Sequence, residues 1–264
     1  MDKGALIIVI YTILICCLAG MGAGIGTGLA GMSAATVISP MLITFLGMDA
    51  YEAIGIALAS DVLASAVSSY TYGKNKNIDI KNGLPMMAIV LAFTCIGSII
   101  SSYIPTTTMG GIAVFGTLGM GIKFLIAPVN TTKQEMEILD LKKRRIKLVC
   151  GGIVIGLICG FMGAGGGIMM LLILTTVLGY ELKTAVGTSV FIMTFTALTG
   201  AASHFIIGGM PQIECLLICV LSTLIWAKLA ATFANRVSPK ILNKSMGDML
   251  CTLGVIMIYF NYFM

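Results

Sequence analysis

A cluster of small residues between 163 and 167 is the part of this sequence with the clearest chemical potential. It lies in the apolar stretch GFMGAGGGIMMLL and consists of Gly163, Ala164, Gly165, Gly166 and Gly167. Glycine in a helix interior costs about 1 kcal/mol relative to alanine, so the cluster predicts a break in a helix. The first N–H groups of a helix have no internal partner and carry a partial positive charge. The pattern therefore predicts a backbone site for a small anion.

Other residues could complete such a site. Thr188 and Ser189 follow Gly187 and offer O–H donors to an oxyanion. In the first half of the chain we expect a corresponding break within GLAGMSAAT, at Gly31, Met32, Ser33 and Ala34. A hydroxyl group on a helix can instead bond the backbone carbonyl one turn back, and this alternative stays open for Ser33, Thr188 and Ser189.

Two ionisable side chains are candidates for coupling an anion to a proton or another cation. Asp61 falls in the middle of an apolar segment, where a carboxylate costs about 2.5–3.5 kcal/mol. His204 is the only histidine, and imidazole changes its charge near neutral pH. Structural roles are the alternatives, namely a protonated carboxyl group bonded to a neighbouring helix and a histidine at the membrane interface.

Motifs for catalysis and cofactor binding are missing from the sequence. There is no HExxH, no serine spaced with a histidine or lysine base, no phosphate-binding loop and no dinucleotide fingerprint. The 8 cysteines lie almost wholly in apolar segments and form no CxxC, so we interpret them as small buried hydrophobes. We expect no enzyme, no metal, no cofactor and no nucleic-acid partner.

The composition is that of a membrane protein. The 264 residues are 58% hydrophobic and 10% charged, whereas a soluble domain carries about 25% charged residues. The mean hydropathy is +1.03. Apolar runs near the length of about 20 residues that crosses a bilayer recur along the chain. The sequence therefore predicts an all-α, polytopic membrane protein.

An internal repeat emerges when the sequence is shifted by 132 residues. Six glycines then coincide with six others: Gly20, Gly24, Gly28, Gly31, Gly47 and Gly55 with Gly152, Gly156, Gly160, Gly163, Gly179 and Gly187. We expect a first transmembrane repeat at 1–128, a charged cytoplasmic linker at 129–146 and a second transmembrane repeat at 147–264. Together they would form one membrane domain.

Each half shows the same order of elements. An apolar segment interrupted by glycines, 4–47 or 147–178, comes first, and three conventional spans follow. We place these at 52–72, 84–104, 109–127, 183–207, 212–233 and 247–263. The interrupted segment is too long for one straight crossing and short for two, so it predicts either a re-entrant hairpin or a pair of shortened spans. The glycines spaced by four before each break favour tight helix packing.

Basic residues cluster in three loops, 73–83, 128–147 and 234–246. The positive-inside rule places these loops in the cytoplasm. We expect the protein to be a multi-pass protein of the cell membrane. The span 52–72 then runs inward while its counterpart 183–207 runs outward, so the two repeats are inverted. Broken helices at matching positions of inverted repeats point to a binding site near the bilayer midplane.

Several segments resemble one transporter family. The GAGGG block followed by ELKTAVGTSVFIMTFTALTGAASHFIIGG (181–209) resembles the second-half signature of the TauE/SafE sulfite exporter family, also called the toluene-sulfonate uptake permeases. LIWAKLAATFANRVSPKIL (224–242) is similar to a later segment of that family, and the first half is similar but more diverged. The resemblance implies a secondary transporter for sulfite, organosulfonates or related sulfur-containing anions. The sequence departs from the pattern where GMSAA replaces the first glycine-rich block and Asp61 stands opposite Met193.

These observations together predict a secondary active transporter that binds a small sulfur-containing anion at the two glycine-rich breaks. Its partners would be the lipid bilayer, the anion and a coupled proton or cation, and a homodimer is compatible with the sequence. A passive anion channel and a non-transporting membrane partner subunit are the alternatives.

Overall fold

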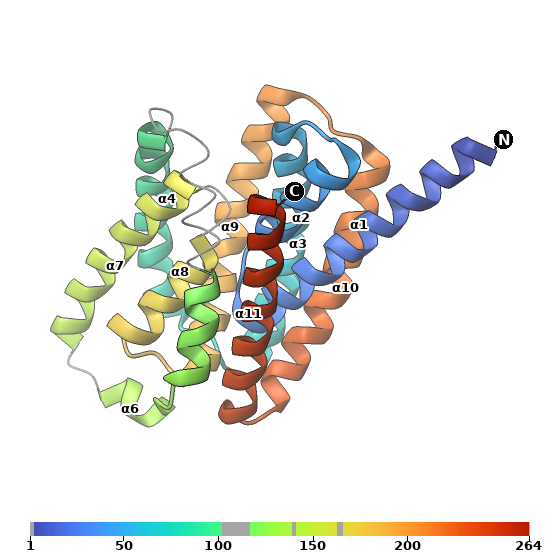
Figure 1. Cartoon of the computed structure of the whole chain (residues 1–264). Coiled ribbons are helices and arrows are strands. Elements are labelled where there is room, and N and C mark those ends of the chain that lie inside the picture. The colour runs from blue at the N-terminus through green and yellow to red at the C-terminus, as the bar shows by residue number, and fades with distance from the viewer. Residues whose placement is uncertain (1–2, 102–116, 139–140, 163–165, 264) are drawn as a thin grey trace.

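The computed structural model describes residues 3–101, 117–138, 141–162 and 166–263, which form helices joined by short turns (Figure 1). The labelled elements are α1 (Lys3–Ala30), α2 (Ala35–Leu46), α3 (Ala50–Lys74), α4 (Ile80–Ser101), α6 (Lys133–Ile138), α7 (Leu141–Met162), α8 (Gly166–Leu172), the π-helical η1 (Ile173–Val177), α9 (Leu182–Gly208), α10 (Ile213–Arg236) and α11 (Pro239–Phe263). A further helix, Thr117–Ile126, packs against α11.

Five helices of the described residues are long and apolar enough to cross a membrane. These segments are Leu6–Ala30, Ala50–Lys74, Leu182–Ile206, Ile213–Arg236 and Pro239–Tyr259. Shorter apolar helices occur beside the predicted breaks: Ala35–Leu46 and Gly166–Val177. The 12 residues of α2 extend about 18 Å, less than the hydrocarbon thickness of about 30 Å. The prediction of an all-α, polytopic membrane protein is confirmed.

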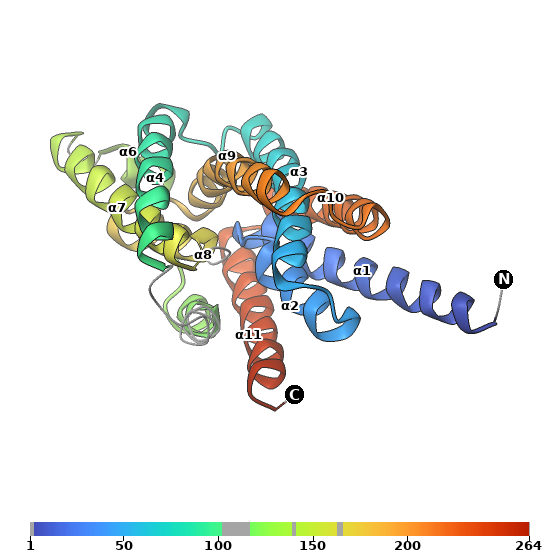
Figure 2. The same cartoon turned by 90° about the horizontal axis from the view of Figure 1, so that it is seen from above.

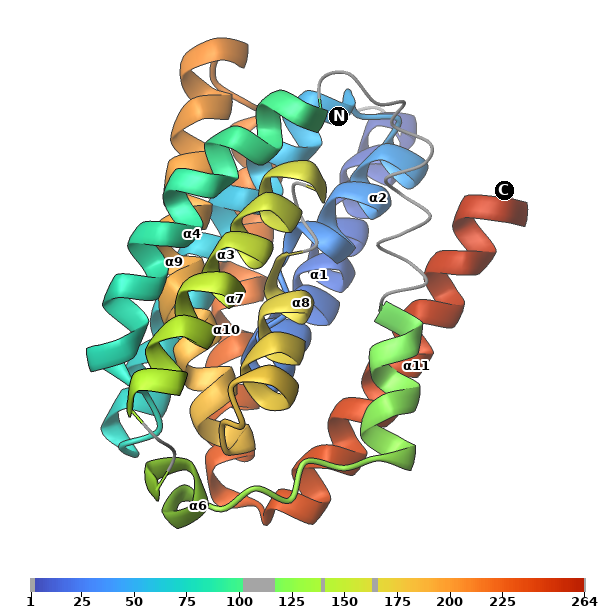
Figure 3. The ribbon, with the colours of Figure 1, turned by 90° about the vertical axis from the view of Figure 1, so that its left-hand side faces the viewer.

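The chain is interrupted in both halves, after α1 and after α7. The first break lies between Ala30 and Ala35. In the second half α7 is described as far as Met162 and α8 from Gly166, and the two helices run in opposite directions. Gly163, Ala164 and Gly165 lie outside the described residues. After each break the chain turns back: α2 returns toward the end of the molecule where α1 starts, and α8 returns toward the end where α7 starts (Figures 1 and 3). Each interrupted segment is thus a hairpin of one long and one short arm.

Glycines before the breaks let helices from opposite halves pack closely. An added Cβ at Gly24 of α1 would lie 2.5 Å from the carbonyl oxygen of Thr223 on α10. At the matching Gly156 of α7, the added Cβ would lie 2.6 Å from Cβ of Phe93 on α4. The most extensive helix interfaces, α1 with α10, α4 with α7 and α3 with α9, each join one half to the other. In Figure 2, α9 lies between the α3–α10 side and the α4–α7 side.

Two further pairs matched by the 132-residue offset have the same local role. Gly47 and Gly179, with φ of 62° and 64°, end α2 and η1 in the left-handed conformation that glycine adopts most easily. Asp49 and Glu181 then cap the next helices: the backbone N–H of Tyr51 donates to Asp49 and that of Thr184 to Glu181, both at 2.9 Å. The repeat in the sequence therefore reflects repeated helix ends.

The three basic loops meet at one end of the molecule, which we call the basic end. Lys133 Nζ donates to the Lys76 carbonyl at 3.0 Å, and Asn77 Nδ2 donates to Asn235 Oδ1 at 2.7 Å. The α2–α3 and α9–α10 turns lie at the other end, which we call the opposite end (Figure 3). Helices α1, α3 and α10 run toward the basic end, whereas α4, α7, α9 and α11 run away from it. These directions support the inverted repeat, which stays a prediction.

A comparison of three alanine variants tests the glycine packing. Gly24→Ala and Gly156→Ala gain helix propensity but force apart two backbones, and overpacking costs about 1–3 kcal/mol. Gly119→Ala is the control, because a Cβ there meets nothing within 4 Å among the described residues. We expect thermal unfolding in detergent to show lower midpoints for the first two variants and an unchanged or higher midpoint for Gly119→Ala. Equal midpoints for all three would show that these contacts do not matter.

Candidate functional site

A cavity of about 290 Å³ extends from the middle of the helix bundle toward the opposite end. Helices α3, α4, α7, α8 and α9 contribute its walls. At mid-depth it is lined by Ser33, Asp61, Gly166, Gly167 and Met193, and nearer the opposite end by Gly200, Ser203 and His204. The volume is near the lower end of the range of about 300–1,000 Å³ for small-molecule sites. Five of the residues singled out in the sequence thus line one cavity.

The two helix breaks touch each other at the deep end of this cavity. A methyl group added to Gly167 would overlap the carbonyl oxygen of Gly31 and lie 2.6 Å from Sδ of Met193. It would also lie 3.1 Å from the backbone nitrogen of Ser33. Gly31 itself has φ of 61°, so a larger residue there would be strained. Only glycine at these two positions allows the breaks this approach.

In the first half, the N–H groups that follow the break are already hydrogen-bonded within the chain. Within residues 31–34, the N–H of Gly31 donates to the Thr27 carbonyl at 3.0 Å and that of Met32 to the Gly26 carbonyl at 3.2 Å. Just after them, the N–H groups of Ala35 and Thr36 donate to Ser33 Oγ and to the Ser33 carbonyl, at 3.4 and 3.1 Å. Met32 and Ala34 are fully buried and do not line the cavity. The backbone donors expected to hold an anion at residues 31–34 are therefore largely used by the protein itself.

Asp61 occupies the space beside the first break. Ser33 Oγ donates a hydrogen bond of 2.6 Å to Asp61 Oδ2. The side chain is 1% exposed, and Oδ1 has no hydrogen-bond partner within the described part of the chain. The start of α2 is close by, where the helix dipole favours negative charge. A carboxyl group of the protein thus stands where the sequence predicted a bound anion.

The second half differs at this position, because Met193 replaces Asp61 in the 132-residue alignment. Met193 lines the cavity and carries no charge. Beside it lie Gly166 and Gly167, which begin α8. Room for an anion from outside the protein is therefore on the second-half side of the deep end.

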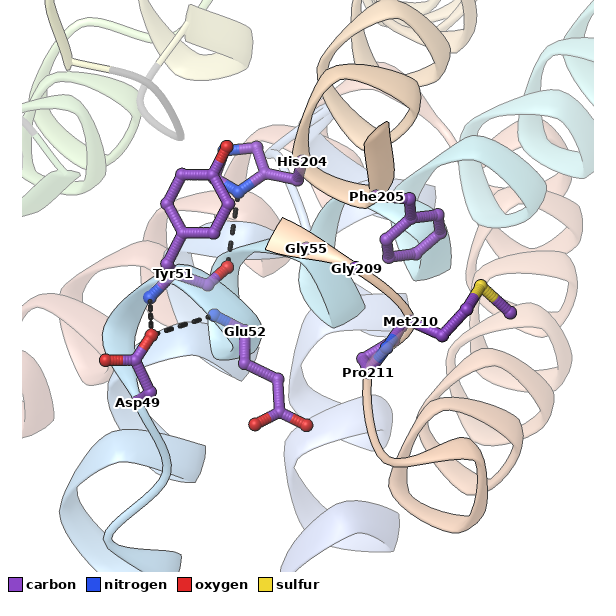
Figure 4. Close-up of a pocket in the computed structure, with 9 residues that line it drawn as sticks. All are labelled: Asp49, Tyr51, Glu52, Gly55, His204, Phe205, Gly209, Met210 and Pro211. Carbon is purple, nitrogen blue, oxygen red and sulfur yellow. Dashed lines mark hydrogen bonds between the residues drawn. The ribbon is translucent and has the colours of Figure 1, made fainter. Parts of the chain in front are cut away.

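His204 lines both the cavity and a neighbouring pocket of about 220 Å³ at the opposite end (Figure 4). Its Nδ1 lies 3.2 Å from the carbonyl oxygen of Tyr51, and the two rings are 4.1 Å apart. A carbonyl only accepts, so this contact assigns the hydrogen to Nδ1, and the neutral ring keeps a lone pair on Nε2. Because the Nδ1–H group is bonded to Tyr51, only a protonated His204 would offer an N–H group, at Nε2, to an anion. The pocket also contains Asp49 and Glu52.

Thr188 and Ser189 are not brought into the cavity. Thr188 Oγ1 accepts a hydrogen bond of 3.1 Å from the backbone N–H of Asp79 and so ties the α3–α4 turn to α9. Ser189 Oγ donates to the Val186 carbonyl at 2.8 Å and packs against Gly31. Both side chains are fully buried.

A group of hydroxyl side chains in the cavity wall was not singled out from the sequence. They are Thr94, Thr196, Thr199 and Ser203. Thr199 donates to the Phe195 carbonyl at 2.7 Å, and Ser203 donates to the Thr199 carbonyl at 2.9 Å, so both hydroxyl hydrogens are bonded within α9. The spacing of three and four residues between 196, 199 and 203 places these hydroxyl groups on one face of α9, and this pattern could have identified that face from the sequence.

Comparisons with known proteins agree with this architecture. The family model for the sulfite exporter TauE/SafE matches residues 16–257. The chain is 26% identical over 256 residues to a probable membrane transporter protein of Methanocaldococcus jannaschii, covering 90% of this chain and 92% of that protein. It is 25% identical over 268 residues to the probable membrane transporter protein YunE of Bacillus subtilis, covering 92% and 96%. No solved structure gives a significant match.

The family match spans both helix breaks and every described wall of the cavity. Its relatives are matched over nearly their full lengths. The chain therefore belongs to the TauE/SafE sulfite exporter family and is a multi-pass membrane transporter.

Proposed function

We propose that this protein is a secondary active transporter that moves a small sulfur-containing anion, such as sulfite or an organosulfonate, across the cell membrane. The observation that carries the proposal is the meeting of two helix breaks at the deep end of one cavity. Backbone of this kind is tolerated at membrane depth where it is buried in protein or lines a cavity. The family provides the class of substrate.

The anion would bind beside Gly166 and Gly167, on the side of the cavity that lacks the carboxyl group. The backbone amides of Gly166 and Gly167 are the donors proposed to hold it, because both residues line the cavity. The hydroxyl groups of Thr196 and Ser203 can turn from their own helix carbonyls and donate to an oxyanion, because a hydroxyl rotates freely about its C–O bond.

The charges in the cavity favour coupling to protons. Among the described lining residues, Asp61 and His204 are the ionisable groups apart from cysteines, and none is a lysine or arginine. An ionised Asp61 would repel an anion at the same depth, whereas a protonated Asp61 would not. We therefore propose that Asp61 carries a proton together with the anion. We also propose that His204 takes part in this proton coupling at the place where the cavity meets the neighbouring pocket.

The orientation follows from the basic residues. With the loops 73–83, 128–147 and 234–246 in the cytoplasm, the basic end faces inward and the cavity extends toward the outside of the cell membrane. The structure would then represent an outward-facing state of the transporter.

Transport assays with two alanine variants test the binding site. Reconstituted protein should exchange labelled sulfite or a sulfonate across the membrane, with a rate that saturates. Gly167→Ala should reduce this exchange at least about tenfold, because the added methyl group pushes apart two breaks that must hold the anion within about 1 Å. Gly119→Ala, at an open position, should retain the rate of the unmodified protein.

Three outcomes decide between this proposal and its alternatives. Flux that does not saturate and shows no counterflow would identify a passive channel. A protein that moves none of sulfite, sulfonates, thiosulfate or sulfate would favour a non-transporting partner subunit. Full exchange by folded Gly167→Ala would reject the proposed binding site.

An isosteric substitution tests the role of Asp61 in coupling. Asp61→Asn keeps the hydrogen bond with Ser33 but cannot carry a titratable proton. We expect the variant to exchange labelled for unlabelled anion and to lose acceleration by an imposed pH gradient. Asp248→Asn, at an exposed position on α11, is the control and should respond to the gradient like the unmodified protein. An unchanged pH response of Asp61→Asn would remove Asp61 from coupling.

A further inference from the structure

Helix α3 carries a buried copy of the stripe that lines the cavity on α9. On α9 the cavity is lined by Met193, Ala197, Gly200 and His204. The 132-residue offset pairs these four positions with Asp61, Ser65, Ser68 and Tyr72 on α3. Asp61 lies at the deep end of the existing cavity, and the other three continue from it toward the basic end, each with 0% exposure. We call these four residues the α3 stripe.

The two copies differ in what covers them. On the cavity side, α9 makes few contacts with α4, and the space between them contributes to the cavity. On the other side, α3 packs extensively along α10, which is the counterpart of α4. Of these two equivalent helix pairs, α9 and α4 are therefore separated, whereas α3 and α10 are closed against each other.

The α3 stripe is polar although it is buried. Ser65 Oγ and Tyr72 Oη donate to the backbone carbonyls of Asp61 and Gly28, respectively. Ser68 Oγ is buried and lacks a hydrogen-bond partner in the part of the chain that the structure describes. Buried hydroxyl groups are nearly always hydrogen-bonded, so an unsatisfied one needs an explanation. Exposure to water or to a polar ligand in a second conformation provides that explanation for Ser68.

The contacts that close the basic end are ones that a conformational change can break. Asn77 Nδ2 donates to Asn235 Oδ1 at 2.7 Å, and Lys183 Nζ donates to the Val237 carbonyl at 2.7 Å, so both bonds hold the end of α10. Both Asn235 and Lys183 are partly exposed, so water can replace these partners. Movement of α10 away from α3, together with helix α1, which packs along α10 and accepts the bond from Tyr72, would then uncover the stripe.

We infer that the protein forms a second cavity, open at the basic end, into which the same anion passes from the deep end of the first. This inference rests on the proposed transport function, which requires access from both sides of the membrane. The residues expected to line the second cavity are the counterparts of lining residues of the first: Thr27, Ser65, Ser68, Tyr72, Thr223 and Ala227.

Cysteine accessibility tests the second cavity without knowledge of the substrate. Single cysteines are placed in a protein whose native cysteines have been replaced, and oriented vesicles receive a membrane-impermeant methanethiosulfonate at either end. Ser68→Cys probes the second cavity, and the matched Gly200→Cys probes the first. A protein that retains only Cys219 is the buried control, because this side chain has 0% exposure between α1 and α10.

We expect Ser68→Cys to react from the basic end and Gly200→Cys to react from the opposite end. A minor conformation is commonly populated at about 0.1–10%, so the Ser68→Cys reaction should be about 10- to 1,000-fold slower than that of Gly200→Cys. It should still be clearly faster than the reaction of Cys219. Ser65→Cys is a second probe of the same stripe if Ser68→Cys does not fold.

Two results would overturn the inference. One is that folded Ser68→Cys and Ser65→Cys react from the basic end no faster than Cys219. The other is that they react from the opposite end as fast as Gly200→Cys, which would assign the stripe to the first cavity. If the stripe reacts from the basic end in a protein that moves no sulfur-containing anion, the second cavity stands and the proposed substrate class falls.

Discussion

The contact between the two helix breaks is the constraint on which the rest of the structure depends. Gly167 lies against the Gly31 carbonyl because neither residue has a side chain to keep the hairpins apart. This contact brings the start of α8 beside Ser33 and Asp61, and so places backbone groups and a carboxyl group at one depth. The glycine-mediated packing of α1 on α10 and of α7 on α4 holds the long arms that present the two breaks.

Asp61 makes the two halves chemically different although their helices are arranged alike. In the first half its carboxyl group stands beside the start of α2, and Ser33 is bonded to it. In the second half Met193 leaves the equivalent space to the cavity. A site made from two similar halves thus receives one acidic group and one uncharged position, which is the asymmetry on which the proposed binding of a proton beside an anion rests.

Much of the fold was predictable from the sequence because glycine clusters indicate helix breaks and clusters of charged residues indicate loops outside the membrane. The breaks after Ala30 and Met162 follow from glycines that a helix interior disfavours, and the shared basic end follows from the loop lysines and arginines. The ligand roles of Thr188 and Ser189 could not be judged from sequence, since a hydroxyl beside a break can equally bond Asp79 or a helix carbonyl. The wall of Thr196, Thr199 and Ser203 depends on which face of α9 meets a cavity, which is a property of packing between distant helices.

In the proposed transport cycle, the single acidic group at the centre would also limit the electrical work. Only one of the two equivalent positions, 61 and 193, can take up a proton. If one proton accompanies a singly charged anion such as hydrogen sulfite, each complete cycle moves no net charge across the bilayer, and the membrane voltage neither drives nor opposes net transport. A doubly charged cargo would leave one negative charge uncompensated, at about 2.3 kcal/mol for every 100 mV. Preference between ionic forms of the cargo would then depend on the energised state of the membrane as well as on the shape of the cavity.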